Sequence, residues 1–285
     1  MKLLDLYHHS VAELSTVMES GTASFETYCL LEKVFGWDKH AVLRHKEEEV
    51  SEEQVSAYIS LLERRKGGYP LQYLLGSWEF WGYDFLVGEG VLIPRADTEI
   101  LCETVLELAK EFLMPKIADL CSGSGCLPVV YAMQMPQSKV TAVELSDEAL
   151  PYLLKNVERY GCDNVTVLHQ DALTWEPEQK LHIISSNPPY ISAEEINELQ
   201  TEVTYEPRMA LEAPENGLYF YRVLSQRCWN FLVDGGVLAF EVGWKQAEAV
   251  ADLMKAAGFS EIIVRKDYGG NDRVVWGRKR EKQEG

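Results

Sequence analysis

The strongest constraint on the fold is an alternation of strand-like and helix-like segments from about residue 96 onward. The strand-like runs are short and nearly continuous in apolar residues, and helical stretches follow most of them. This pattern is typical of a parallel sheet covered by helices on both faces, an α/β fold of the doubly wound kind. It predicts strands at Lys116–Leu120, Lys139–Glu144, Asn164–His169, Leu181–Ser186 and Gly236–Val242, and helices at Leu127–Met135, Asp147–Tyr160, Gly217–Val233 and Lys245–Ala257.

The end of this region has a different pattern. Glu261–Arg265 and Arg273–Gly277 are both strand-like, and the turn-prone Gly269-Gly-Asn-Asp272 lies between them. Two strands around such a turn predict an antiparallel hairpin. We therefore expect a mostly parallel sheet with an antiparallel edge.

The first 75 residues are predicted to form a small helical bundle. Apolar residues from Leu3 to Met18 recur at roughly helical spacing, and Gly21 is expected to end that helix. Ser51 and Gln54 form a capping box at the start of a later helix.

A short segment of different composition separates the bundle from the α/β region. Residues 76–95 are rich in aromatic and β-branched residues and are interrupted by glycines, which predicts a hairpin that bridges two domains. The expected organisation is a helical domain at residues 1–75, a β-hairpin linker at 76–95 and an α/β domain at 96–280.

Charge and cysteine content exclude several classes of protein. The chain has 27 basic and 45 acidic residues, a net charge of −18, so free nucleic acid is disfavoured as the main partner. The six cysteines are scattered without a Cys-x-x-Cys pair, which favours reduced thiols and no metal site. No apolar run reaches the ~18 residues of a membrane span. Asp5 and His8 come too early for a signal peptide, so we expect a cytoplasmic protein with no membrane partner.

A glycine-containing loop, Asp119 to Gly125, is expected to connect a strand to a helix. Gly123 and Gly125 let the backbone turn sharply and approach a ligand with no Cβ in the way. The dinucleotide-binding fingerprint is incomplete, because Pro128 stands where its third glycine would fall. On its own, the loop fits either a ligand site or a plain strand-to-helix corner.

Acidic residues follow the loop at informative positions. Glu144 ends the next predicted strand, 19 positions after Gly125, which is about where a ribose diol is held in nucleotide-binding folds. Ser146 or Asp147 can cap the next helix, so Glu144 is expected to be free for a ligand. The loop and this acid together predict a nucleoside-containing cofactor. Asp171, after the next strand, could meet an adenine amino group or stabilise a turn.

The tetrapeptide Asn187-Pro-Pro-Tyr190 directly follows the predicted strand Leu181–Ser186. Ligands of open α/β sheets bind beyond the carboxyl ends of the strands, so the tetrapeptide is expected to face the cofactor. Pro188 and Pro189 have no backbone N–H and therefore offer only carbonyl acceptors. Asn187 adds a side-chain acceptor, and Tyr190 adds a planar ring. These groups suit a planar N–H₂ group, such as an amide or an exocyclic base amine. Asn-Pro-Pro is also a good turn sequence, but its position favours a site.

These motifs resemble those of S-adenosylmethionine-dependent amino methyltransferases, and more narrowly the glutamine methyltransferases of peptide-chain release factors. The tetrapeptide is shared with DNA adenine methyltransferases, whereas the Leu-Ile-Pro-Arg and Glu-Pro-Arg segments together are particular to the release-factor group. The helical N-terminal region matches in arrangement rather than in residues. The matching segments are Pro70–Gly76, Leu92–Glu99, Asn187–Ile191, Glu206–Leu211, Glu241–Gly243 and Asp267–Arg273.

The resemblance implies a Rossmann-like methyltransferase sheet that binds S-adenosyl-L-methionine. It implies contacts to the cofactor from Cys121, Ser122, Gly123, Ser124 and Gly125, with Glu144 at the ribose, Asp171 and Ala172 at the adenine, and Asn187–Tyr190 at the substrate amide and beside the cofactor. Three residues depart from the family's usual pattern: Cys121 stands for a glycine, Glu144 for an aspartate and Ala172 for an aromatic residue.

The implied reaction is methylation of the side-chain nitrogen (N5) of the glutamine in a release factor's Gly-Gly-Gln motif. The Asn187 oxygen and the Pro188 carbonyl would each accept one amide N–H, and Tyr190 would stack on the amide plane. These motifs contain no Ser–His or Cys–His arrangement, so no dedicated base is predicted. We expect a monomer whose partner is a release factor, docked by the helical domain, with no direct binding of nucleic acid.

Three other functions fit fewer of these features. An enzyme that methylates an exocyclic amine of nucleic acid, such as that of adenine, would use the same acceptors, but a basic groove is expected for it. A non-enzymatic binder would not need the glycine loop and the tetrapeptide intact. A dehydrogenase is disfavoured by the incomplete glycine fingerprint.

Overall fold

The computed structural model describes residues 1–37 and 39–280, and the chain divides into two compact units. The first unit holds Met1–Ser77 together with Gln200–Tyr205, and the second holds Trp78–Leu199 and the chain from Glu206 onward. Residues 200–205 therefore belong to the helical unit, although they lie within the α/β region of the sequence.

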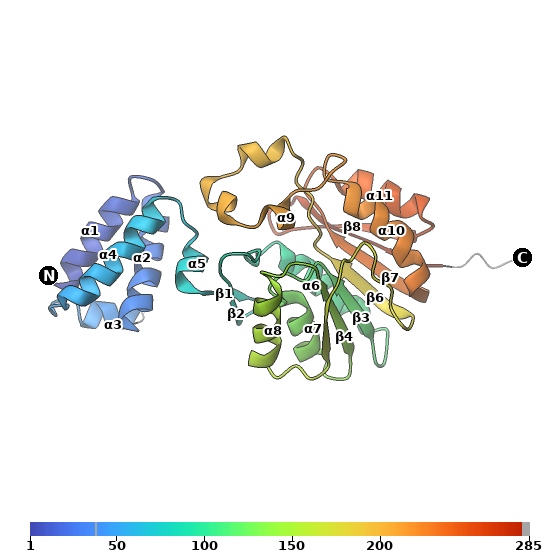
Figure 1. The fold of residues 1–285 in the computed structure, drawn as a ribbon, viewed down its shortest axis with the longest axis horizontal. Coiled ribbons are helices and arrows are strands. Elements are labelled where there is room, and N and C mark those ends of the chain that lie inside the picture. The colour runs from blue at the N-terminus through green and yellow to red at the C-terminus, as the bar shows by residue number, and fades with distance from the viewer. Residues whose placement is uncertain (38, 281–285) are drawn as a thin grey trace, which may run out of the picture. The chain divides into compact units, whose positions relative to one another are not determined.

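The first unit is a helical bundle with a leucine-rich core (Figure 1). The predicted capping box is confirmed, because the Gln54 N–H donates to Ser51 Oγ over 3.2 Å and the Ser51 N–H donates to Gln54 Oε1 over 3.2 Å. Its helices are α1 (Leu3–Leu14), α2 (Ser20–Phe35), α3 (Lys39–Arg44), α4 (Glu52–Lys66) and α5 (Leu71–Leu75), with a 3₁₀ turn η2 at Thr201–Tyr205.

The predicted end of the first helix is wrong. Helix α1 ends at Leu14, and Gly21 lies in the first turn of α2 instead of stopping a helix. Glycine keeps its N–H group and costs a helix only about 0.5–1 kcal/mol relative to alanine, so it does not by itself end one. Ala23 is fully buried in this turn, which explains why α2 begins before it.

A buried ion pair attaches residues 200–205 to the bundle. Arg65 of α4 donates to both carboxylate oxygens of Glu26, over 2.5 and 2.9 Å, and to Glu202 Oε1 over 2.6 Å. Arg65 and Glu26 are only 3% and 6% exposed, so each charge depends on the other for compensation. The segment that carries Glu202 is therefore part of the folded helical unit.

The second unit confirms the predicted doubly wound, mostly parallel sheet with an antiparallel edge. Seven strands form one sheet within the described residues, in the order β5-β4-β3-β6-β7-β9-β8. The first five of these are mutually parallel, and β9 runs antiparallel to both β7 and β8. The strands are β3 (Lys116–Leu120), β4 (Lys139–Glu144), β5 (Val165–His169), β6 (Leu181–Ser186), β7 (Leu232–Glu241), β8 (Ser260–Lys266) and β9 (Asp272–Arg278).

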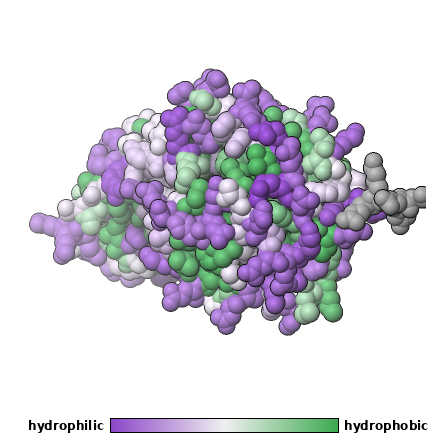
Figure 2. All heavy atoms as spheres, turned by 45° about the vertical axis from the view of Figure 1, so that its right-hand side comes forward, coloured by the Kyte–Doolittle hydropathy of each residue, from purple (hydrophilic) through white to green (hydrophobic). Residues whose placement is uncertain are grey.

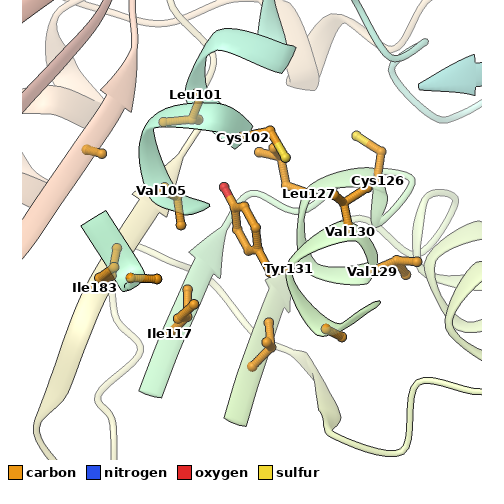
Figure 3. Close-up of a cluster of buried hydrophobic side chains, with 14 of the residues drawn as sticks. Leu101, Cys102, Val105, Ile117, Cys126, Leu127, Val129, Val130, Tyr131 and Ile183 are labelled. Atoms are coloured by element: carbon orange, nitrogen blue, oxygen red, sulfur yellow. The ribbon is translucent and has the colours of Figure 1, made fainter. Parts of the chain in front are cut away.

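Neighbouring residues of each central strand point to opposite faces of the sheet, and both faces are buried. Ile183 of β6 packs in the core cluster formed with α6 and α7, whereas Ile184 packs in the cluster formed with α10 and α11. Figure 3 shows the first cluster, where the ring of Tyr131 extends from α7 toward α6. The helices are α6 (Thr98–Ala109), α7 (Cys126–Gln134), α8 (Leu150–Arg159), α9 (Arg208–Leu211), α10 (Tyr219–Phe231) and α11 (Ala247–Ala256), with a 3₁₀ turn η1 at Glu195–Glu198.

The predicted hairpin consists of β1 (Ser77–Phe80) and β2 (Tyr83–Leu86). Phe80 and Phe85 are at most 1% exposed and pack edge to face, with ring centroids 6.1 Å apart, in the same cluster as α6 and α7. Phe80 and Phe85 are thus core residues of the second unit, and Trp81 and Tyr83 are partly buried against the same cluster.

The surface is mainly polar on the face shown in Figure 2, where hydrophobic residues form separate patches among hydrophilic ones. Across residues 1–37 and 39–280, no helix has the length and apolar character needed to cross a membrane.

Candidate active site

An open cavity lies in the second unit, at the carboxyl ends of four neighbouring strands. The loops that follow β3, β4, β5 and β6 all contribute to its lining. This is the edge where open α/β sheets bind their ligands. The sequence-predicted site residues that line the cavity are Cys121, Gly123, Glu144, Asp171, Ala172, Asn187 and Pro189.

The loop after β3 is a tight turn with three left-handed residues. Cys121, Gly123 and Gly125 have φ angles of +63°, +52° and +82°. A Cβ on Gly125 would lie 2.4 Å from Leu153 Cδ1, so close packing against α8 requires glycine there. Cys121 adopts a conformation that is costly for a residue with a side chain, which gives a physical reason for glycine at this position.

Ser122 and Ser124 act inside the loop and do not line the cavity. Ser122 Oγ donates to the Asp119 carbonyl over 3.0 Å, and the Ser122 carbonyl accepts from the Gly125 N–H over 2.8 Å. The Ser124 carbonyl accepts a 2.9 Å bond from Asn156 Nδ2. Both serines therefore shape the backbone that faces the ligand.

Glu144 lines the cavity, but its carboxylate is already bonded to the protein. Oε2 accepts from the Gly123 N–H and Oε1 from the Ser146 N–H, both over 2.7 Å. The expectation that Glu144 is free is thus wrong. The predicted capping by Ser146 is wrong too: Ser146 Oγ accepts from the Ala149 N–H over 3.1 Å in the turn before α8, but the N-cap residue of α8 is Ala149 and makes no side-chain cap. Each carboxylate oxygen has two lone pairs, so acceptor capacity toward a ligand remains.

Asp171 stabilises a turn and also lies at the cavity, and its contact to an adenine stays a prediction. Its Oδ1 accepts from the Leu173 N–H over 2.8 Å, which stabilises the turn, and the residue also lines the cavity. Ala172 beside it is 6% exposed and lines the same wall.

The tetrapeptide is divided between the cavity and the core. Asn187 and Pro189 line the cavity, whereas Pro188 and Tyr190 are absent from its lining. The Tyr190 N–H donates to the Leu211 carbonyl over 3.1 Å, its carbonyl accepts from Gln246 Nε2 over 3.0 Å, and its ring packs against the α10–α11 cluster. Burial, reinforced by the nearby Glu241 charge, raises the pKa of the Tyr190 hydroxyl, which therefore stays protonated.

Two buried carboxyl groups lie beneath the site. Asp119 is 1% exposed and Glu241 is 2% exposed, and burial raises the pKa of each to about 7. Asp119 Oδ1 accepts from Ser185 Oγ over 2.7 Å. Within the described part of the chain, Asp119 Oδ2 and Glu241 Oε2 have no hydrogen-bond partner.

Ion pairs connect three segments for which the sequence predicted no role. They are Leu92–Glu99, Glu206–Leu211 and Asp267–Arg273. Glu206, 5% exposed, accepts from the Ile93 N–H over 3.0 Å and pairs with Arg95. Arg273 pairs with Asp97 over 2.9 Å and with Asp267 over 3.2 Å. The signal available in the sequence was that these separate motifs each contain arginine and acidic residues, which can form ion pairs with one another. The two pairs of Arg273, which lies in β9, attach the segments before α6 and after β8 to the sheet, whereas the Arg95–Glu206 pair joins two loop segments.

Metal binding and nucleophilic cysteine chemistry find no support in the residues described. Residues 1–37 and 39–280 contain no group of three or more His, Cys, Asp or Glu side chains placed to hold a metal ion. Burial, followed by the Glu144 charge, raises the pKa of the Cys121 thiol, so the thiol stays neutral and is a poor nucleophile.

Comparison with known proteins adds independent information. Residues 5–76 match the PrmC N-terminal domain model and residues 96–213 match the methyltransferase small domain model. A release factor glutamine methyltransferase of Fusobacterium nucleatum is 36% identical over 286 residues, 99% of this chain and 80% of that protein. The Escherichia coli protein of the same name is 33% identical over 274 residues, 95% of this chain and 98% of its own.

A solved structure with a similar fold is the hMettl16 catalytic domain in complex with MAT2A 3′UTR hairpin 6. Its TM-score is 0.58 at 13% identity, over 81% of this chain and 84% of that one, which shows the fold alone. The curated relatives, in contrast, are similar over nearly the whole length, and the resemblance inferred from the motifs is confirmed. The protein is a member of the release factor glutamine methyltransferase family.

Proposed function

We propose that this enzyme methylates the side-chain amide nitrogen of the glutamine in the Gly-Gly-Gln motif of peptide chain release factors, with S-adenosylmethionine as methyl donor. The observation that carries the proposal is that Asn187 and Pro189 line the same cavity as Gly123 and Glu144. Strand β6 pairs with β3, and β3 with β4, so an amide acceptor and a cofactor loop meet at one edge of the sheet.

The cavity suits S-adenosylmethionine in its chemistry. Its lining is mostly apolar with a few convergent polar groups, as is usual for small-molecule sites. Glu144 has acceptor capacity for ribose hydroxyls, Asp171 and Ala172 form the wall proposed for the adenine, and Gly123 leaves the backbone approachable. When bound, the cofactor supplies an electrophilic methyl group on its sulfonium sulfur, and this sulfur is the leaving group when the methyl group is transferred.

The protein's role is then to hold a poor nucleophile in position. An amide nitrogen shares its lone pair with its own carbonyl, so orientation matters more than acid–base chemistry. In this proposal the Asn187 side-chain oxygen and the Pro188 carbonyl accept the two amide N–H bonds, which aims the nitrogen and favours the positive charge that develops on it. Because Tyr190 packs against the core, its proposed stacking on the substrate requires that the amide reach the face of that ring.

The wider context of the proposal comes from the relatives and the sequence. The relatives' name specifies release factors, so the partner is a protein and the place of action is the compartment of translation, in line with the expected cytoplasmic location. The monomeric state and a docking role for the helical unit remain predictions of the same proposal.

The test combines the purified protein with S-adenosylmethionine labelled in the methyl group and with recombinant release factor or double-stranded DNA. We expect label on the release factor, mapped by mass spectrometry to the Gly-Gly-Gln glutamine side chain. Label on adenine of the DNA, with none on the release factor, would support the alternative exocyclic-amine methyltransferase instead. Asn187→Ala serves as the inactive control.

A further inference from the structure

We propose that Thr98 is a positioning residue, whose hydroxyl holds the Asn187 amide in the one orientation that presents its oxygen to the substrate. The inference rests on the proposed function and adds to it a residue that contacts neither substrate nor cofactor in this scheme. It concerns an interaction between the first residue of α6 and the residue that follows β6.

The first observation is a direct hydrogen bond. Asn187 Nδ2 donates to Thr98 Oγ1 over 3.4 Å, and Thr98 is 4% exposed. Thr98 cannot move away easily, because Ile100 and Leu101 of the same helix pack with Ile183 of β6 in one buried cluster. The amide therefore has a fixed partner on the side away from the cavity.

The second observation concerns the hydrogen of the Thr98 hydroxyl. Glu241 ends β7, the strand paired with β6, and its side chain is 2% exposed. Thr98 lies near enough to Glu241 that its hydroxyl, like the charge of Arg273, opposes the rise that burial causes in the pKa of Glu241. Glu241 is therefore a carboxyl toward which the Thr98 hydrogen can turn while the Thr98 oxygen accepts from Asn187.

This arrangement discriminates between the two flips of the amide. Oxygen and nitrogen of an asparagine side chain exchange places on a half-turn, and the two orientations are nearly equal in shape. When the Thr98 hydrogen turns toward Glu241, the Thr98 oxygen offers Asn187 only an acceptor, so the nitrogen of Asn187 finds a partner there and its oxygen does not. The oxygen then faces the cavity, where the substrate's amide N–H needs an acceptor. In the flipped form the Asn187 NH₂ group would face that N–H, which would place two donors against each other.

The experiment compares Thr98→Val with Thr98→Ser and with a matched control on the same helix. Thr98→Val keeps the shape and removes the hydroxyl, and we expect kcat for release factor methylation to fall about tenfold, the effect of one hydrogen bond. Thr98→Ser restores the hydroxyl and should recover most of kcat. The control is Thr104→Val, because Thr104 is 2% exposed and its hydroxyl donates to the Ile100 carbonyl over 2.7 Å, within α6.

Two readouts separate positioning from a structural role. Binding of S-adenosylmethionine by calorimetry should stay within about twofold of wild type in Thr98→Val, since only the amide is misdirected. In addition, Asn187→Ala should cost less in the Thr98→Val background than in wild type, because contacting residues are not additive. If Thr98→Val folds poorly, Thr98→Ala in the same cycle gives the same comparison.

Several outcomes would overturn the inference. They are an undiminished kcat in Thr98→Val, an equal loss in Thr104→Val, a loss that appears in cofactor binding, or strictly additive effects with Asn187→Ala. A wild-type chain that leaves release factor unmethylated would overturn the proposed function itself, which distinguishes the two failures.

Discussion

The Gly123 N–H donates a 2.7 Å hydrogen bond to the Glu144 carboxylate, so the loop after β3 and the end of β4 are one structural piece. The other oxygen of Glu144 accepts from the Ser146 N–H. A residue predicted from sequence to hold a ribose therefore also holds the shape of the loop beside it. Its removal should affect both ligand binding and folding.

Glu144→Ala should weaken S-adenosylmethionine binding and lower stability together. Two N–H groups in a largely buried turn lose their acceptor, at a cost of roughly 1–3 kcal/mol each. Calorimetric titration and urea unfolding measure the two effects. Asp147→Ala, at a side chain that is 93% exposed, is the control and should change neither. Unchanged cofactor affinity in Glu144→Ala would place the ribose elsewhere.

Asn187→Ala should lower turnover far more than cofactor affinity. Loss of an acceptor aimed at developing charge costs on the order of 2–4 kcal/mol, by analogy with oxyanion-hole donors. Single-turnover methylation of release factor at saturating cofactor measures this loss. Asn197→Ala is a suitable control, because Asn197 is exposed and bonds only locally to the Ala193 carbonyl. Full activity in Asn187→Ala would remove the proposed mechanism.

Cys121→Gly should leave the protein at least as stable as wild type. The left-handed φ of +63° costs a non-glycine residue roughly 1–2 kcal/mol, which exceeds the entropic cost of ~0.5–1 kcal/mol for introducing glycine. Cys121→Val should be clearly destabilising, since β-branched residues tolerate this conformation poorly. Thermal unfolding of both variants checks the order. A strongly destabilised Cys121→Gly would mean that packing of the thiol outweighs the strain.

Asp119→Asn should flatten the dependence of stability on pH. Burial raises the pKa of Asp119 to about 7 in the folded protein, whereas an unfolded aspartate titrates near 4. Between these values the unfolded chain releases the proton first, so the free energy of unfolding falls as pH rises from about 4 to about 7. The amide cannot titrate, which removes up to ~1.4 kcal/mol per pH unit from that slope.

Urea unfolding at several pH values between 4.5 and 7.5 measures the slope. The wild type should retain the part due to Glu241, whose pKa burial also raises to about 7. Parallel curves for wild type and Asp119→Asn would show that Asp119 is ionised throughout the range.

Phe25→Glu should raise KM for intact release factor while leaving a short Gly-Gly-Gln peptide unaffected. Phe25 lies on α2 of the helical unit and is 55% exposed, so a charge introduced there changes the surface of this unit without entering its core. Leu113→Glu in the α/β unit is the matched control, because Leu113 is 94% exposed. Equal effects on peptide and protein substrates would contradict a docking role for the helical unit.

Much of the α/β fold was predictable because its signals are local. The apolar runs at Lys116–Leu120, Lys139–Glu144 and Leu181–Ser186 are strands with the predicted bounds, and the turn at 269–272 forms the predicted antiparallel edge. Helix α6 was not predicted, although Ile100, Leu101, Val105 and Leu108 have helical spacing in the sequence.

The amino-acid sequence by itself determined which chemical groups follow which strands, because chain order places each loop directly after its strand. Only the tertiary structure decided which of those groups meet. Asn187 contacts Thr98, 89 positions away, and Arg65 contacts Glu202, 137 positions away. The first contact depends on strand order and on how α6 packs on the sheet, and the second depends on the return of residues 200–205 to the helical unit. Neither is encoded in the local spacing of polar and apolar residues.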